Sequence, residues 1–305
     1  MALDIFLATH LPLSRRELRG CIHGGRVYVE GQRAFRANAP LERGQKILYF
    51  PGELARAPEG LESASLLHRE EDLWVLNKPP LLASQATPDP RVPHVKAYLH
   101  QGWGAEARGL DLCHRLDKET SGLLLLARGK LQGEIMEAFK RRQVEKSYLA
   151  LCHGRAPKGS WERRSYLRPP HGETGRVLEA SSGGRFALSF FENLGSSPCG
   201  RVSLLLCRPK TGRTHQLRVH CAAMGLPIVG DKKYCLRQDL QLPRRLQWKA
   251  LEHHRLHALG LKLHLREREL AFQAPLPPSF LDLLRALALI HILKTVPTGL
   301  FQGPL

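Results

Sequence analysis

HRLDKETSGLLLLAR (residues 114–128) is the stretch of sequence that decides the fold. Its Thr120-Ser121-Gly122 turn leads into residues 123–127, an apolar run of the length expected for a strand that is covered on both faces. Such a strand would hold the preceding carboxylate, Asp117, rigidly at the rim of a cleft, where it is a candidate reacting group. A second interpretation is that Asp117 only caps the turn, as Asp often does before Thr, Ser and Gly.

Four further segments accompany this stretch: LWVLNKPP (73–80), EKSYLAL (145–151), TGRTHQLRVHCAAMGLPIVGDKKY (211–234) and RLHALGLKL (255–263). With HRLDKETSG, the second and third of them resemble the catalytic motifs of the RluA-type pseudouridine synthases, in the order that the family has them. The other two resemble strands near the beginning and the end of that family's catalytic domain. The resemblance covers residues 66 to about 280 of the chain.

This resemblance implies an α+β pseudouridine synthase fold, with a long, bent, mixed or antiparallel sheet and an active-site cleft at its middle. It implies that Asp117 is the catalytic residue, that Arg218 pairs with it, and that Tyr148 stacks on the target base. HQLRVH, the segment around Arg218, alternates like a strand. Without the family, Arg218 would be interpreted as one phosphate contact among many arginines, and Tyr148 as a tyrosine of the core.

RNA contact is expected around the same motifs. A uracil inside folded RNA must be extruded before it can react, at a cost of a few kcal/mol. Arg115 matches the family position that enters the RNA stack as the base flips, although it also suits a surface ion pair. His114 is expected to support the loop by hydrogen bonding. The other substrate-binding candidates are polar residues of the two motifs: Thr120, Arg213, Thr214, His215 and Gln216.

The expected reaction detaches uracil from ribose carbon 1, rotates the base and rejoins it through carbon 5. An ionised Asp is available at neutral pH without a separate activating base, so no cofactor is predicted. The carboxylate could attack ribose, add to the uracil ring, or abstract a sugar proton, and the residues do not distinguish these routes. His253, His254 and His257 have helix-like spacing but no nearby acid or cysteine at ligand spacing, so no metal is predicted.

The composition favours a nucleic-acid partner. Lys and Arg number 46 against 28 Asp and Glu, which leaves a net charge of +18 and a pI near 10.0. The seven cysteines are scattered without a CxxC pair, which indicates a reducing setting rather than a disulfide framework. Because no signal-peptide pattern and no apolar run of about 20 residues is present, we expect a cytoplasmic protein that does not span a membrane.

The length suits a small domain and a large one. Residues 1–50 are predicted to form two helices, LDIFLATHL and a second one capped by Ser14, followed by the strands RVYVEGQR and QKILYF. This order resembles the S4-type RNA-binding domain, in which Arg15, Arg16, Arg19 and Arg26 would contact phosphates. We predict a linker at 51–65, a catalytic domain at 66–285 that includes a helix at 130–142, and a terminal helix and tail at 286–305. The apolar segment SFLDLLRALALIHIL (279–293) suggests the terminal helix.

The sequence therefore predicts an RNA pseudouridine synthase that acts on specific uridines of structured RNA, most plausibly large-subunit ribosomal RNA. The alternatives are the same reaction on transfer RNA, or a non-catalytic RNA-binding protein of ribosome assembly. No protein partner is required by the sequence, and the sequence does not specify an oligomeric state.

Overall fold

The computed structural model describes residues 1–23, 26–30, 32–50, 66–87, 92–171, 175–235 and 253–296. The chain forms two compact units, one from Met1–Glu62 with Leu82–Arg108, the other from Ser63–Leu81 with Gly109–Leu305. Each unit has its own hydrophobic core. The predicted linker at 51–65 lies outside the described residues, and the predicted domain boundaries stay a prediction.

The first unit contains the two helices and the short strands that the sequence predicts. Its elements are α1 (Leu3–His10), α2 (Arg15–His23), β1 (Val27–Val29), β2 (Gln32–Arg33), β3 (Ile47–Tyr49) and α3 (Val95–Trp103). The strands form an antiparallel sheet in the order β2-β1-β3. Ser14 caps α2 as predicted, because its hydroxyl accepts the N–H of Glu17 while the Glu17 carboxylate accepts the N–H of Ser14.

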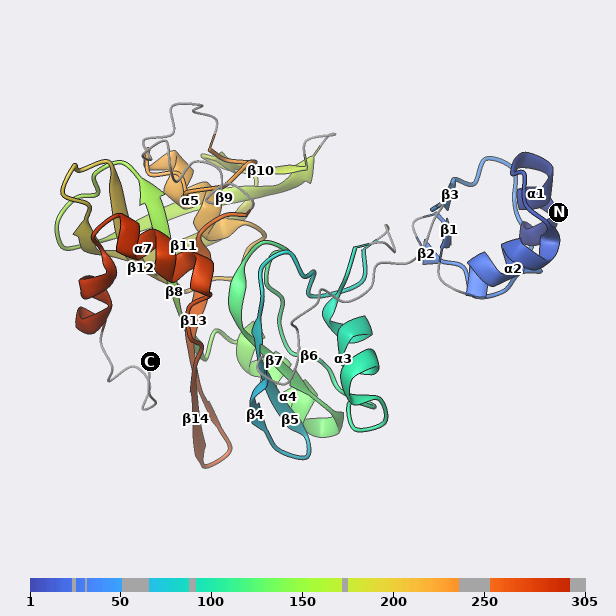
Figure 1. The fold of residues 1–305 in the computed structure, drawn as a ribbon, viewed down its shortest axis with the longest axis horizontal. Helices are drawn as coiled ribbons and strands as arrows, with labels where there is room; N and C mark the ends of the chain where they lie inside the picture. Colours follow the sequence, from blue (N-terminus) through green and yellow to red (C-terminus); the bar gives the residue numbers. More distant parts are fainter. Residues whose placement is uncertain are drawn as a thin grey trace. The chain divides into compact units, whose positions relative to one another are not determined.

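The second unit is built on one large mixed sheet (Figure 1). Its strands are β4 (Leu66–Arg69), β5 (Leu73–Lys78), β6 (Asp111–Leu112), β7 (Ser121–Ala127), β8 (Val144–His153), β9 (Ser160–His171), β10 (Arg176–Ala180), β11 (Arg185–Ser196), β12 (Val202–Pro209), β13 (Leu256–Leu265) and β14 (Arg268–Gln273). Its helices are α4 (Gly129–Lys140), α5 (Gln216–Ala223), α7 (Pro278–Ala286) and the 3-10 helix η3 (Ile290–Thr295).

The strand order β10-β9-β11-β12-β8-β13-β7-β5-β4 is antiparallel except where β13 meets β7. This parallel junction at the middle of the sheet pairs Ala258 with Gly122. Gly122 has a φ of +108°, and a Cβ at this position would overlap the backbone of Ala258. The glycine of the TSG turn is therefore required where the two halves of the sheet join, a few residues after Asp117.

Helices cover both faces of the sheet (Figure 1). On one face, α7 and η3 pack against β8 and β12 through apolar residues such as Phe280, Leu284 and Ile292. On the opposite face, α5 packs through Leu217 and Cys221. The strand β7 is buried along its whole length, as the apolar run predicts. The mixed α+β architecture predicted from the sequence is confirmed.

Two local predictions were wrong. HQLRVH was predicted to be strand-like, but it is helical from Gln216, the first residue of α5. His215 precedes the helix with a left-handed φ of +54°. All residues from 216 to 221 are buried, so their alternating polarity does not mark an exposed and a buried face. The terminal apolar segment is not one helix, since α7 ends at Ala286 and Ala288 adopts a φ of +57° before η3.

Within the described part of the chain, no helix combines the length and the apolar character that crossing a bilayer would need. The positions 297–305 of the predicted tail lie outside the described residues.

Candidate active site

Asp117 lies in the loop that precedes β7, with its side chain 26% exposed. Three contacts hold this loop. The N–H of Thr120 donates to the carbonyl oxygen of Asp117 at 3.1 Å, the Thr120 hydroxyl lies 2.8 Å from Nε2 of His254, and the buried Nζ of Lys78 donates to the carbonyl oxygen of Lys118 at 3.1 Å. The carboxylate is thus presented on a backbone that is fixed from Asp117 to Thr120.

Arg218 reaches Asp117 from α5. Its Nη1 donates to Oδ2 of Asp117 at 3.0 Å, while Nε and Nη2 donate to the two oxygens of Asp231 at 2.7 and 2.9 Å. The predicted proximity of Arg218 and Asp117 is therefore present in the structure. The fork geometry joins a partly exposed carboxylate to a fully buried one through a single guanidinium.

The two buried partners stabilise each other's charge. Burial by itself disfavours the charged form of each. For Arg218, the hydrogen bonds and charge of Asp231, together with the charge of Asp117, outweigh burial and raise the pKa. For Asp231, the hydrogen bonds and charge of Arg218 outweigh burial and lower the pKa. Both groups therefore stay ionised at neutral pH.

His215 and Tyr234 form the second side of the site. Nδ1 of His215 lies 2.8 Å from the hydroxyl of Tyr234, and Nε2 of His215 lies 3.8 Å from Oδ2 of Asp117. The Tyr234 hydroxyl also accepts the N–H of Val177 at 2.9 Å, and the Arg218 guanidinium lies 5.1 Å from the centre of the Tyr234 ring. Burial lowers the pKa of His215 despite the charge of Asp117, so its ring is neutral at neutral pH.

Tyr148 projects from β8 and is partly buried against a hydrophobic cluster that includes Leu217 and Cys221 of α5. Burial raises the pKa of its phenol, and the negative charge of Asp117 raises it further. Tyr148 therefore remains a neutral phenol at neutral pH, electrostatically coupled to the candidate carboxylate. Its predicted stacking on a base stays a prediction.

Lys78 is a buried lysine at this site that the sequence did not single out. Its Nζ also donates to the carbonyl oxygen of Pro79 at 2.9 Å. Burial lowers its pKa to about 7, although the charge of Asp117 acts in the opposite direction. The amino group of Lys78 thus holds the backbone next to Asp117 while lying within its electrostatic reach.

The other predicted residues differ in their surroundings. Nε2 of His114 accepts the N–H of Leu125 at 3.1 Å, which is the expected supporting role in the loop. Gln216 is buried and bonded to Thr211 and Ser189, and Thr120 is buried against His254. Arg115 and Thr214 are exposed. Nε of Arg213 donates to the carbonyl oxygen of Phe186 at 3.0 Å. Their contact with substrate stays a prediction.

Besides Lys78, two residues of this site were missed. Asp231 and Tyr234 occur in GDKKY, the end of the 211–234 block, but a single carboxylate was expected at the site. The N–H groups of Lys233 and Tyr234 both donate to Oδ1 of Asp231, at 2.9 and 3.0 Å. The sequence signal for Asp231 was an apolar pair, Ile228-Val229, followed by Gly-Asp and a turn. The same pattern also fits an ordinary turn with no role in the site.

The predicted histidine cluster has a structural role. His257 lies in β13, with Nδ1 2.9 Å from the Ser121 hydroxyl and Nε2 3.2 Å from the carbonyl oxygen of Ala274. His254 contacts Thr120 and the carboxylate of Glu119. These histidines therefore connect β13 to the turn that follows Asp117. No group of three or more His, Cys, Asp or Glu among the described residues is arranged to hold a metal ion.

Comparison with known proteins places these features in a family context. The family model described as RNA pseudouridylate synthase matches residues 72–223. The chain is 31% identical to "Ribosomal large subunit pseudouridine synthase C" of Rickettsia felis, over 80% of this chain and 78% of that protein. It is 30% identical to an uncharacterized RNA pseudouridine synthase of Synechocystis, over 92% of this chain and 95% of that protein.

A solved structure is also similar. "Human RNA Pseudouridylate Synthase Domain Containing 4" aligns with a TM-score of 0.61 and 28% identity, over 74% of this chain and 94% of that one. The matched family segment 72–223 includes Asp117, Tyr148 and Arg218. These comparisons do not test an S4-type domain in the first unit.

Proposed function

Since this chain belongs to the RluA-type pseudouridine synthase family, we propose that it isomerises specific uridines in large-subunit ribosomal RNA. The observation that carries the proposal is the ion pair between Asp117 and Arg218, on a loop fixed by Lys78 and Thr120. The choice of ribosomal RNA is supported by the names of the Rickettsia relatives.

In the proposed reaction the bond between uracil nitrogen 1 and ribose carbon 1 breaks, and a bond from carbon 5 to carbon 1 forms. Carbon 5 loses a proton and nitrogen 1 gains one, so no co-reactant is consumed. Asp117 acts on the sugar or the base, and Arg218 orients the carboxylate by a charge-assisted hydrogen bond. Because Nε and Nη2 of Arg218 donate to Asp231, the guanidinium is preorganised before RNA binds.

Tyr148 is assigned to the base. A neutral phenol has an apolar ring that can stack on uracil and a hydroxyl that can relay a proton. Its raised pKa excludes a phenolate that would remove the carbon 5 proton directly at neutral pH. We therefore assign Tyr148 to holding the base and to relaying the proton, whichever of the three routes Asp117 follows.

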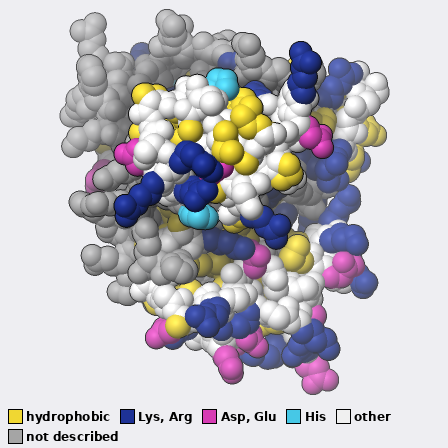
Figure 2. Space-filling model, turned by 90° about the vertical axis from the view of Figure 1, so that its right-hand side faces the viewer, with side chains coloured by type: hydrophobic (Ala, Val, Ile, Leu, Met, Phe, Trp, Pro, Cys, Tyr) yellow, Lys and Arg dark blue, Asp and Glu magenta, His cyan; other side chains and the backbone are white. Residues whose placement is uncertain are grey.

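RNA is held by exposed basic side chains. Lys and Arg exceed Asp and Glu by 18 in the whole chain, and basic side chains are widely distributed over the face in Figure 2. We assign Arg115, which is exposed two residues before Asp117, to filling the gap that the flipped base leaves. Arg15, Arg16, Arg19 and Arg26 of the first unit are assigned to phosphates, as in an S4-type domain. Arg15 and Arg19 are both oriented by the buried carboxylate of Asp4.

The test is tritium release from RNA labelled at uridine carbon 5, with ribosomal RNA and transfer RNA as separate substrates. The wild type is expected to release tritium from large-subunit ribosomal RNA, and Asp117→Asn to release none while binding RNA with nearly unchanged affinity, because phosphate contacts carry most of the binding. Asp282→Asn, which alters an exposed carboxylate of α7, is the matched control and should behave as the wild type.

Each other result has a definite meaning. Release from transfer RNA alone would refute the proposed substrate but keep the reaction. Tight RNA binding without release from either RNA would refute the enzymatic proposal in favour of a ribosome assembly role. Loss of RNA binding in Asp117→Asn would show that Asp117 has a structural function.

A further inference from the structure

The outermost strands β10, β9 and β11 have two faces of different character. Their inner face packs Leu167, Val177 and Ala187 against Val219 of α5. Because side chains alternate along a strand, the neighbouring positions point to the opposite face. That face leaves Tyr166 42% exposed and Phe186 36% exposed, which is unusual for two aromatic side chains in adjacent strands of a large sheet.

The two aromatic residues are direct partners in the sheet. Tyr166 of β9 is paired with Phe186 of β11, and their rings meet edge to face with centroids 5.9 Å apart. Arg164 and Arg168 stand two residues before and after Tyr166, so they share its face of the strand. Both arginines are exposed. We name these four residues, Arg164, Tyr166, Arg168 and Phe186, the outer aromatic surface.

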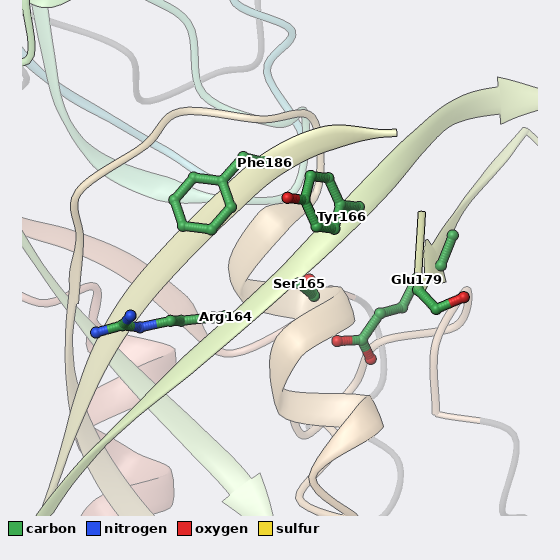
Figure 3. A pocket seen from close by; sticks show the side chains of 7 residues that line it. Arg164, Ser165, Tyr166, Glu179 and Phe186 are labelled. Carbon is green, nitrogen blue, oxygen red and sulfur yellow. The ribbon is translucent and has the colours of Figure 1, made fainter. Parts of the chain in front are cut away.

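A cavity of about 440 Å³ opens at this surface. It is lined by Arg164, Tyr166, Phe186 and Ser181. Ser165 and Glu179 also border it, but their side chains point to the inner face, where they contact His220 and Arg163. Figure 3 shows the rings of Tyr166 and Phe186 side by side, from the neighbouring strands β9 and β11, with Arg164 extending from β9. The volume lies in the range of small-ligand sites, which begins near 300 Å³.

We propose that the outer aromatic surface binds unpaired RNA nucleotides at a second site, outside the active site. A base would stack on Tyr166 or Phe186, the neighbouring phosphates would contact Arg164 and Arg168, and the exposed Ser181 would contact the base edge or the ribose hydroxyl. The proposal rests on the proposed function only in that RNA is the substrate.

Charge complementarity favours RNA over a protein partner. Two arginines flank the aromatic pair on one strand, and the only acid beside them on that face of β9 within the described residues, Glu162, pairs with Arg164 at 2.7 Å. Arginine and aromatic side chains in alternation are suited to a chain of stacked bases joined by phosphates. The face is opposite to α5, which carries Arg218. A nucleotide bound there therefore lies outside the active site.

The first experiment measures fluorescence anisotropy of a labelled single-stranded RNA of about ten mixed nucleotides, a length within the site sizes of single-strand binders. All variants carry Asp117→Asn, which prevents turnover. The double variant Tyr166→Ala with Phe186→Ala is expected to weaken binding about tenfold or more, since stacking contributes strongly per base. Tyr166→Phe should stay within about twofold of the parent, because it keeps the stacking ring.

Two further variants separate RNA binding from a general apolar contact. Leu178→Ala removes an exposed apolar side chain from the same face of β10, and it should leave RNA binding within about twofold, because leucine offers no stacking face. Arg164→Gln should reduce the magnitude of the slope of log affinity against log salt concentration by about one, the change expected for the loss of one phosphate contact.

Crosslinking locates the contact directly. The same RNA with 4-thiouridine, irradiated on the wild type, should crosslink to peptides of β9 or β11 that contain Tyr166 or Phe186. Wild-type affinity in the double alanine variant, with no crosslink in these peptides, would overturn the proposal. A second outcome would also overturn the proposal: the wild type self-associates in sedimentation, whereas the double alanine variant is monomeric and binds RNA with wild-type affinity.

The outcome is independent of the enzymatic test. Aromatic-dependent RNA binding in a protein that releases no tritium would refute the proposed function and keep the second site. Tritium release with RNA binding that is insensitive to Tyr166 and Phe186 would refute the second site alone.

Discussion

Arg218 gives Asp117 one hydrogen bond, from Nη1 to Oδ2 at 3.0 Å, and its Nε and Nη2 donate to a second, buried carboxylate, that of Asp231. The same guanidinium thus binds two carboxylates, that of Asp117, which is partly exposed to solvent, and that of Asp231, which is buried. The buried pair with Asp231 sets the position of the arginine, and the arginine sets the direction of Asp117. Activity should therefore depend on Asp231 although it lies behind the reacting group.

Asp231→Asn should lower both stability and activity. The substitution removes the charge that compensates buried Arg218, and breaking such a pair costs about 3 kcal/mol. The resulting displacement of Arg218 should reduce kcat for tritium release about 100-fold, since misplacement near 1 Å has effects of this size. Urea unfolding and single-turnover release measure the two effects. Glu192→Gln, which breaks the half-exposed pair with Arg208, is the control and should cost less than about 1 kcal/mol.

Arg218→Lys tests whether the geometry of the guanidinium donors, and not only the positive charge, is needed for activity. A lysine ammonium keeps the positive charge but cannot present separate, fixed donors to Asp117 and Asp231. We expect kcat to fall about 100-fold, as for the loss of one preorganised donor, with little change in RNA affinity. Tritium release at saturating RNA checks this. A variant with wild-type kcat would show that the charge alone, without the fork geometry, is sufficient.

The sequence predicted those parts of the site that depend on local pattern. The apolar run of β7 and the turn before it placed Asp117 correctly at the start of a buried strand. Ser14 was identified as the cap of α2 because a cap depends on residues three apart. In both cases the structural consequence is decided within a short window of sequence.

What could not be predicted depends on tertiary contacts. Arg218 was placed in a strand because its neighbours alternate in polarity, whereas the segment is a helix buried on all sides. Its polar residues are bonded to several elements, for example Gln216 to Ser189 of β11. The pairing of Arg218 with Asp231 spans 13 positions and a turn. The periodicity of polar and apolar residues in the local sequence carries no information about such a contact.

Buried histidines predict a loss of stability in mild acid. Burial lowers the pKa of His257 to about 4 and that of His220 to about 4, so both are neutral in the folded state. The unfolded chain, with histidine pKa values near 6.5, binds protons first as the pH falls. The stability these residues contribute is thus present above about pH 6.5 and is lost progressively towards about pH 4.

Urea midpoints at about pH 7 and pH 5 measure this effect, and the pH interval lies within the titration window of the unfolded histidines. His257→Gln should reduce the difference between the two midpoints, because one proton-linked group is removed. His264→Gln changes an exposed histidine of the same strand β13 and is the matched control. An unchanged difference in His257→Gln would contradict the assigned neutral state of His257.

Gly122→Ala should disrupt the junction between the two halves of the sheet. Gly122 has a φ of +108°, and the added Cβ would overlap the backbone of Ala258, so β7 and β13 would have to separate. We expect a loss of at least about 2 kcal/mol in the free energy of unfolding from urea titration. Gly133→Ala in α4 is the control, because open space surrounds that position and alanine favours a helix by about 1 kcal/mol. If Gly122→Ala matched the wild type in stability and tritium release, close approach of β7 and β13 would not be what positions Asp117.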